Sequence, residues 1–366
     1  MISWQRPVQI CLGPGGVGKT TISAASGIAG ALAGERVVVL TIDPARRLAD
    51  VLGLVRPSAR ALGGGDALGN EPRLVPGPWP GELWAAMLDP AETLTGLIRR
   101  YGGEQQAERV LANPLFAPIS ASLSGIGEYM AAERLRELHL DPRFDRVVID
   151  TPPSRHAVDF LDSPQRLTNF VDNRFYRLVL APRRALVRSV SVAAKLVVRT
   201  TARLVGAELV DDVIALFADL SGLDQGFRQR AVETSALLDG PDCAYLLVTT
   251  ARHEPLREAR WIRNNLTRRH KSIDTVIVNR LSPAAGLENL IITGGRKADR
   301  AALQANVDQL LSLRRQEDEL VADVTRSSSA LGIEDRGAPI RSIEDLAEVA
   351  AQLRPLPAAA GDRSRR

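Results

Sequence analysis

Eight consecutive residues near the amino-terminal end restrict the possible folds of this chain more than any other feature. Residues 13–20 are Gly-Pro-Gly-Gly-Val-Gly-Lys-Thr and satisfy the pattern G-x-x-x-x-G-K-[ST]. The short apolar run Val8–Leu12 precedes them, and the small-residue stretch Thr21–Ala33 follows, closed by Gly34. These flanks predict a strand, a glycine-rich loop and a helix in succession, which disfavours a chance glycine-rich turn. A loop in this context predicts a site for phosphate groups.

The residue types of this loop suit a nucleoside triphosphate bound with Mg²⁺. Glycines let the backbone curl so that successive N–H groups point at phosphate oxygens, and the helix that begins near Lys19 adds its positive dipole end. Lys19 supplies a mobile charge for the β- and γ-phosphates and is a candidate catalytic residue. Thr20 offers a hydroxyl to Mg²⁺, a hard ion that prefers oxygen ligands. The expected cofactors are ATP and Mg²⁺, and the expected binding residues in this segment are Gly13, Pro14, Gly15, Gly16, Val17, Gly18, Lys19, Thr20 and Thr21.

Two aspartates follow buried strands and complete the predicted site. Asp150 comes directly after Arg146–Ile149, and Asp43 comes directly after Val37–Ile42. Ligands of open α/β sheets gather beyond the carboxyl ends of the strands, so both carboxylates are expected near the phosphates. We assign Asp150 to Mg²⁺, through a water molecule, and Asp43 to orienting the attacking water, because phosphoryl transfer depends mainly on positioning and charge. The competing interpretations are a helix-capping aspartate at Asp150 and a turn-forming Asp-Pro at Asp43.

The order of apolar runs predicts a doubly wound α/β fold with a mostly parallel sheet. Runs that are apolar on both faces alternate with helical stretches, as in sheets covered on both sides. Besides the first strand these runs are Val37–Ile42, Arg146–Ile149, Ala244–Val248 and Thr275–Val278.

Two long insertions interrupt this alternation, approximately residues 82–140 and 161–238, and both are predicted to be mainly helical. We expect residues 1–366 to form a single P-loop domain in which these insertions build a helical subdomain. Residues 56–80 are rich in Gly, Pro and Ala and predict a mobile surface loop. The terminal segment 356–366 predicts a disordered tail.

The composition limits the cellular compartments and the classes of partner that are expected for this protein. Cys11 and Cys243 are the only cysteines, too few for a disulfide framework, and no export signal or run of eighteen apolar residues occurs. These features predict a cytoplasmic protein, with peripheral attachment at the inner membrane face as an alternative. A net charge of +4 is too small to indicate nucleic-acid binding, and no Asn-Lys-x-Asp motif for guanine occurs, which favours ATP over GTP.

Four segments together resemble one known family. They are Gly13–Thr21, Thr41–Asp50, Asp150–His156 and Val278–Arg280. This combination resembles the ArsA family of arsenical pump-driving ATPases and their relatives that target tail-anchored membrane proteins, within the deviant Walker A class that includes MinD and ParA. The resemblance covers most of the chain and implies an ATPase of that P-loop fold class.

The resemblance also implies roles for individual residues. It places Asp43 in switch I near the attacking water and Asp150 at the start of switch II. Asn279 is implied to lie at the adenine, and His156 to transmit the nucleotide state. A ParA-like partition ATPase is disfavoured because the long helical insertions are more similar to ArsA-like proteins.

One residue departs from the family pattern. The family carries a signature lysine directly after the first glycine of the loop, where it reaches the phosphates of a dimer partner, and this chain has Pro14 there. The chain is similar to a bacterial ArsA-like subgroup without that lysine. The expected function is ATP hydrolysis that drives a conformational or dimerisation switch, as a homodimer or as a heterodimer with a paralogous ATPase. The alternative is a weakly hydrolysing regulatory subunit of such a heterodimer.

A basic helical segment suggests a further partner. Between Asn173 and Ala207 there is no Asp or Glu, and five basic residues recur at helical spacing opposite an apolar side. They are Arg184, Arg188, Lys195, Arg199 and Arg203. One interpretation is docking on an anionic membrane surface or a membrane-protein client. The other is a helix that packs on its own subdomain with a solvated basic face.

Overall fold

The computed structural model describes residues 6–43, 47–54, 68–116, 118, 125–153, 155–172, 224–290, 292–293, 296–326 and 328–353. The basic segment 173–207 and the tail 356–366 lie outside the described residues.

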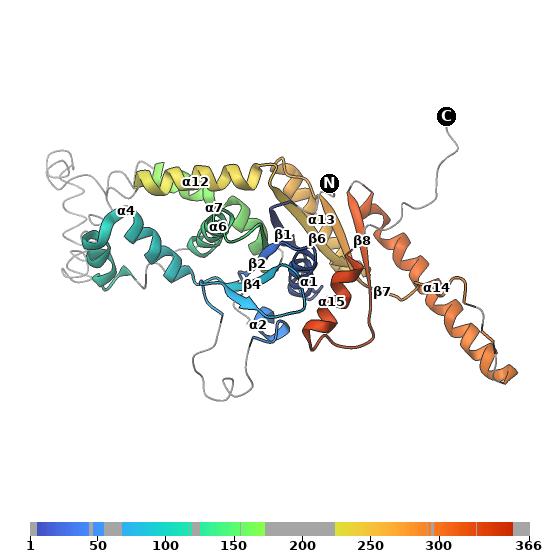
Figure 1. Ribbon diagram of the computed structural model, residues 1–366. Helices are drawn as coiled ribbons and strands as arrows, with labels where there is room; N and C mark the ends of the chain where they lie inside the picture. Colours follow the sequence, from blue (N-terminus) through green and yellow to red (C-terminus); the bar gives the residue numbers. More distant parts are fainter. Residues whose placement is uncertain are drawn as a thin grey trace. The chain divides into compact units, whose positions relative to one another are not determined.

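Eight strands form one sheet in the order β3-β4-β2-β5-β1-β6-β7-β8. Figure 1 shows this sheet with helices around it. Neighbouring strands run parallel except for β3, which pairs antiparallel with β4. The strands are β1 (Val8–Leu12), β2 (Arg36–Thr41), β3 (Arg73–Val75), β4 (Glu82–Met87), β5 (Arg146–Asp150), β6 (Cys243–Thr250), β7 (Thr275–Leu281) and β8 (Ser329–Glu334). The predicted α/β class with a mostly parallel sheet is confirmed, and all five strands expected from the sequence are present.

The central strands are buried along their whole length. Every residue of β1, β5 and β6 is buried, which explains why their sequences are mostly apolar instead of alternating.

The described helices are α1 (Lys19–Leu32), α2 (Arg47–Val51), α4 (Pro90–Ala112), α6 (Ile126–His139), α7 (Arg155–Asp172), α12 (Asp224–Asp239), α13 (His253–Arg268), α14 (Lys297–Thr325) and α15 (Ile343–Gln352).

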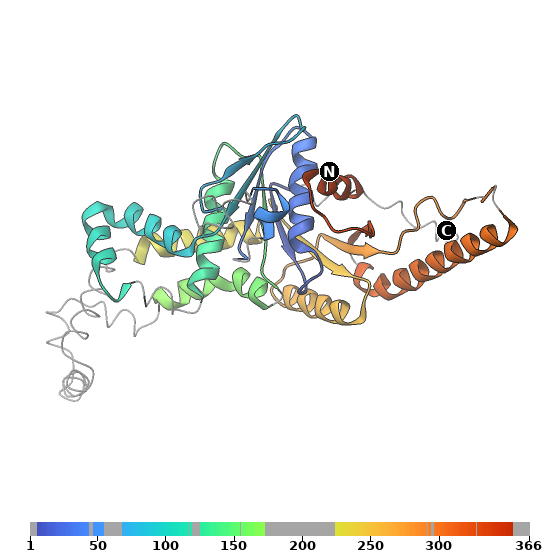
Figure 2. The same cartoon turned by 90° about the horizontal axis from the view of Figure 1, so that it is seen from below.

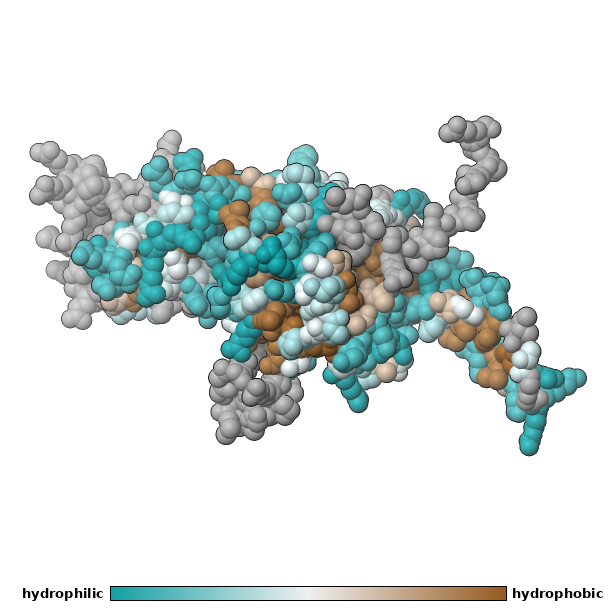
Figure 3. Space-filling view, viewed as in Figure 1, coloured by the Kyte–Doolittle hydropathy of each residue, from teal (hydrophilic) through white to brown (hydrophobic). Residues whose placement is uncertain are grey.

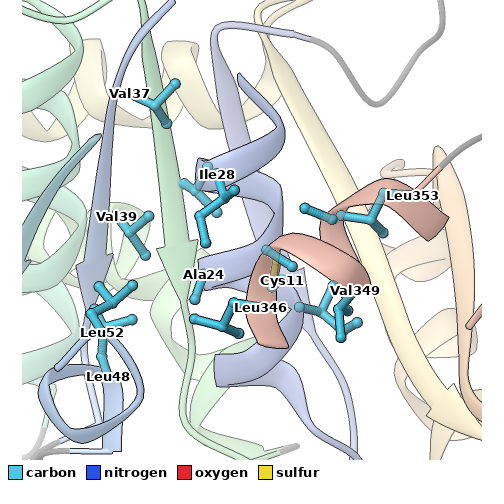
Figure 4. Packing of buried hydrophobic residues seen from close by; sticks show 14 of the residues in the cluster. Cys11, Ala24, Ile28, Val37, Val39, Leu48, Leu52, Leu346, Val349 and Leu353 are labelled. Atoms are coloured by element: carbon cyan, nitrogen blue, oxygen red, sulfur yellow. The ribbon is translucent and has the colours of Figure 1, made fainter. Parts of the chain in front are cut away.

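Helix α1 follows the glycine-rich loop directly, and most of its residues are buried. Ala24 and Ile28 of α1 join Leu346 and Val349 of α15 in the main apolar core (Figure 4). Small residues let α1 pack closely on the sheet, so the loop that precedes the helix rests on a rigid base. The predicted helix 21–33 is confirmed, and it begins two residues earlier, at Lys19.

The chain divides into two compact units. The first comprises Met1–Met87, Leu138–Val158 and Pro241–Arg366 and contains the sheet; the second comprises Leu88–Glu137 and Asp159–Gly240. The described part of the second unit is helical, with two apolar clusters at its centre. One contains Ile98, Ala107 and Val110, and the other contains Leu97, Tyr129, Met130 and Ala231.

Three strands correct the expectations drawn from the sequence. Residues 82–87 form β4 at the start of a segment expected to be mainly helical, and residues 73–75 form β3 inside the expected surface loop. Strand β8 was not anticipated. These strands are short or interrupted by small residues, and β4 is stabilised by pairing with β2, a contact between distant segments that local patterns do not contain.

Two surface properties concern the helices. Within the described residues, no helix combines the length and the apolar character needed to cross a membrane. Helix α14 carries apolar side chains on its surface (Figure 3). Leu303 and Leu313 of this helix are more than two-fifths exposed.

A buried ion pair in the helical unit generates a stability prediction. Arg230 of α12 pairs with Glu133 of α6, and both side chains are buried. Replacing Glu133 with Leu removes the nearest carboxylate from the buried arginine, and Glu137 at 3.6 Å compensates that charge only in part. Hydrogen–deuterium exchange of α6 and α12 amides is therefore expected to accelerate about a hundredfold. The double variant Glu133→Leu/Arg230→Met removes both charges and serves as the control. Equal exchange rates in the single and double variants would contradict the prediction.

Candidate functional site

The glycine-rich loop connects β1 to α1 and fits tightly between neighbouring strand ends. Gly18 has a φ of 93°, in the left-handed region, and a Cβ atom there would lie 2.4 Å from the Asn279 amide nitrogen. A Cβ atom at Gly13 would lie 2.2 Å from the carbonyl oxygen of Val248 in β6. Glycine at these two positions therefore lets the loop approach β6 and β7.

Asn279 of β7 holds the loop in place. Its side-chain amide donates to the Val17 carbonyl at 2.8 Å, and its Oδ1 accepts from the Arg280 backbone N–H at 3.0 Å. The side chain is buried, so these bonds are sheltered from water. The structure thus brings Asn279 to the phosphate loop, while its role at the adenine stays a prediction.

Lys19 lies over its own loop. Its Nζ donates to the carbonyl oxygens of Gly13 at 3.1 Å and Pro14 at 2.8 Å, and the residue is only 7% exposed. Burial lowers the pKa of the Lys19 ammonium, while the carboxylates of Asp150 and Asp43 oppose that effect. The ammonium group therefore lies against the bend of its own loop, with the Asp150 and Asp43 carboxylates nearby.

Asp150 ends β5 at the centre of the site. Thr20 Oγ1 donates to Asp150 Oδ2 at 2.8 Å, and Thr41 Oγ1 donates to the same oxygen at 3.1 Å. Burial raises the pKa of the Asp150 carboxyl to about 6, and the two hydroxyl donors oppose that rise. Its Oδ1 is buried and has no hydrogen-bond partner among the described residues. An acceptor in this state indicates that the site is built for a further donor or a cation.

These residues fit Mg²⁺. The polar atoms that converge are a hydroxyl and a carboxylate, both hard oxygen ligands. No group of three or more His, Cys, Asp or Glu suited to a metal occurs in the described part of the chain. Mg²⁺ ordinarily binds through one or two protein oxygens together with phosphates and water, which is the arrangement that Thr20 and Asp150 could support.

The structure describes the positions of Asp43 and Thr21, and it describes only the backbone of His156. The Asp43 backbone N–H donates to Thr41 Oγ1 at 3.2 Å, and its carboxylate acts on the pKa of both Lys19 and Asp150, so it lies near them. Thr21 is half-buried in the first turn of α1. His156 lies in the first turn of α7, with its side chain outside the description.

Sequence reasoning missed two threonines that organise the site. Thr41 ends β2 in register with Asp150, and its hydroxyl links Asp150 to the Asp43 backbone. Thr151 Oγ1 donates to the Cys11 carbonyl at 2.6 Å and ties the end of β5 to β1. In the sequence, each of these threonines is a hydroxyl residue at or just after the carboxyl end of a buried strand. Only the strand order shows that β2 and β1 are the neighbours of β5.

Comparison with known proteins gives consistent matches. A protein-family model described as anion-transporting ATPase matches residues 8–313. Protein Rv2184c of Mycobacterium tuberculosis is 31% identical over 185 residues, which is 47% of this chain and 41% of the relative. The ATPase get3 of Schizosaccharomyces japonicus is 31% identical over 153 residues, 42% of each chain.

An arsenical pump-driving ATPase of Acidiphilium multivorum is 31% identical over 178 residues, which is 46% of this chain and 27% of the relative. The matched part thus spans less than half the length of each of these three relatives.

The raised pKa of Asp150 predicts that its charge lowers the stability of the protein without ligand. A folded-state pKa of about 6 against an ordinary 3.8 means that protonation stabilises the fold, and that this stabilisation is lost as pH rises through 6. Asp150→Asn removes the charge and is expected to increase the free energy of unfolding by up to about 3 kcal/mol at neutral pH.

Denaturant unfolding of both proteins between pH 4 and 7 tests this expectation, since the two pH values bracket the raised pKa of about 6. The stability difference should close toward the acidic end, where the wild-type carboxyl is protonated. A difference that does not change with pH would contradict a raised Asp150 pKa.

Proposed function

This chain belongs to the family of anion-transporting ATPases, which confirms its resemblance to ArsA, and from that premise we propose that it binds ATP with Mg²⁺ and hydrolyses it to ADP and phosphate. The observation that carries the proposal is the buried Asp150 carboxylate. It accepts a hydrogen bond from the phosphate-loop residue Thr20, and its other oxygen has no hydrogen-bond partner among the described residues. Burial of a charged carboxylate is unfavourable, and its two hydroxyl donors offset only part of that cost, which favours a functional role for Asp150.

The contacts of Thr20, Asp150 and Lys19 support a separate role for each residue in binding Mg²⁺ or phosphate. The Thr20 O–H donates to Asp150, so its oxygen lone pairs are free to face Mg²⁺, and Asp150 would hold the ion through a water. The ion, when bound, neutralises charge that develops on the phosphates. Lys19 would exchange its bonds to two loop carbonyls for charge-assisted bonds to phosphate oxygens.

We assign Asp43 to positioning the attacking water. Its backbone is bonded to Thr41, whose hydroxyl is bonded to Asp150, so three residues connect the two predicted switch segments. A change at the metal side of Asp150 would be transmitted to Asp43 through Thr41. This connection supports a nucleotide-dependent switch of conformation or dimerisation.

Pro14 distinguishes this chain from family members with the signature lysine. Proline contributes a carbonyl acceptor to Lys19 and no positive charge, so one source of transition-state stabilisation is missing. We propose a dimer in which the chain pairs with itself or with a paralogous ATPase that supplies the lysine. A weakly hydrolysing regulatory subunit is the second candidate, and Pro14 is the observation that favours it.

The client is proposed to be a membrane-associated protein or an anionic membrane surface, as the resemblance of the sequence to the ArsA family implies. A cytoplasmic location is supported by Cys11 and Cys243, both buried free thiols whose pKa burial raises to about 12. Thiols in that state are unreactive and do not call for an oxidising compartment.

Two substitutions test the assignment of binding and chemistry. Lys19→Ala is expected to abolish detectable MgATP binding in titration calorimetry, since the phosphates lose their cation. Asp43→Asn is expected to lower ATP turnover about a hundredfold while binding changes little. Asp50→Asn, the same chemical change at an exposed position on α2, is the matched control. Full turnover in Asp43→Asn would refute its catalytic role.

The effect of Pro14 is tested by restoring the lysine. Pro14→Lys is expected to raise turnover by roughly tenfold or more, with a specific activity that increases with protein concentration, because the added charge acts across a dimer. Turnover of the wild-type chain is measured alone and with a lysine-bearing paralogue. If neither the substitution nor the paralogue changes the rate, the dimer proposal fails, and a negligible rate throughout supports the regulatory subunit.

A further inference from the structure

Positive charge is concentrated around one helix of the sheet-containing unit. Residues 252–271 contain six arginines and one lysine against two glutamates, an excess of five positive charges, whereas the whole chain carries +4. The basic residues are Arg252, Arg257, Arg260, Arg263, Arg268, Arg269 and Lys271. They lie on or beside α13, which packs against β6 and α14 (Figure 2, gold).

The apolar face of α13 is buried inside the protein. Leu256, Ala259, Ile262 and Leu266 are buried. On the opposite face Arg257, Trp261, Asn264 and Arg268 follow at helical spacing, and all four are exposed. We call this set the α13 outer face.

Some of the α13 arginines are already paired within the chain. Arg260 and Arg263 both contact Asp323 of α14, so that side of the helix has a structural role. Arg257 pairs with Glu254 on the same helix, where both side chains are more than 70% exposed, and such a pair is worth little in water. The Arg268 Nε donates to the backbone carbonyl of Asn264. This acceptor is neutral, so the contact does not compensate the positive charge of Arg268.

Trp261 lies between Arg257 and Arg268 and is 39% exposed. A large aromatic side chain on the surface loses the stabilisation of burial, and Trp and Arg are the residues that most often dominate protein interfaces. From the helical rise, Arg257 and Arg268 are about 16 Å apart, with the indole between them. The outer face thus offers two cations on either side of an apolar anchor.

We propose that the α13 outer face binds an acidic segment of a partner protein, in which carboxylates flank a central apolar side chain. The two guanidinium groups would bind the carboxylates, and the indole would cover the apolar residue. A protein segment fits better than a lipid surface, because helices that lie in a bilayer interface bury a broad apolar face. On α13 that face is packed against the sheet, and a single aromatic ring projects outward.

Peptide binding to the full chain tests the proposal. The probe is a fluorescent peptide of glutamates with a central leucine, and the reference is the same peptide with glutamine in place of glutamate. Anisotropy is measured at low salt for the wild type, for Arg257→Glu/Arg268→Glu, and for Trp261→Ala. Arg99→Glu/Arg315→Glu reverses two exposed arginines of α4 and α14 and is the matched control.

The wild type and the control are expected to bind the glutamate peptide with similar affinity. Affinity should fall about tenfold in Arg257→Glu/Arg268→Glu and severalfold in Trp261→Ala, with circular dichroism unchanged. Equal affinity in the control and the Arg257→Glu/Arg268→Glu variant would overturn the proposal. Flotation with phosphatidylserine-containing vesicles is run in parallel. Loss of flotation in the same variant, without a difference in peptide affinity, would assign the face to lipid and also overturn it.

Discussion

The hydrogen bonds that two threonines donate to the buried Asp150 carboxylate connect the parts of the site. Thr20 belongs to the phosphate loop and its helix, Thr41 to the end of β2, and Asp150 to the end of β5. Burial opposes the charge of Asp150, and the two hydroxyls offset only part of that cost. The other carboxylate oxygen has no hydrogen-bond partner in the part of the chain that the structure describes. A carboxyl group whose pKa is raised by burial in this way is common at functional sites.

Strand order explains why these residues meet. β1 lies between β5 and β6, and β2 lies beside β5, so the carboxyl ends of all these strands reach one edge of the sheet. The glycine loop occupies that edge, held by Asn279 from β7. Helix α13 follows the end of β6, so the basic outer face lies on a helix that begins at the same edge of the sheet as the glycine-rich loop.

Most of the central sheet could be predicted because its strands are apolar on both faces and bounded by turn residues. The outer strands β3, β4 and β8 could not, since their short or small-residue sequences form strands only when a neighbour supplies hydrogen bonds. The same limit applied to the site. Lys19, Thr20 and Asp150 follow from a motif and a strand end, while the part played by Thr41 depends on β2 being the neighbour of β5.

The amino-acid sequence by itself determined the phosphate loop, the class of fold and the family, because these depend on residues close together in the chain: glycines that permit the bend, a lysine after it, and apolar runs on either side. Only the tertiary structure decided which hydroxyls bond to Asp150, that Asn279 supports the loop, and which arginines of α13 remain on the surface. Those outcomes are set by strand order and helix packing, in which residues more than a hundred positions apart become neighbours.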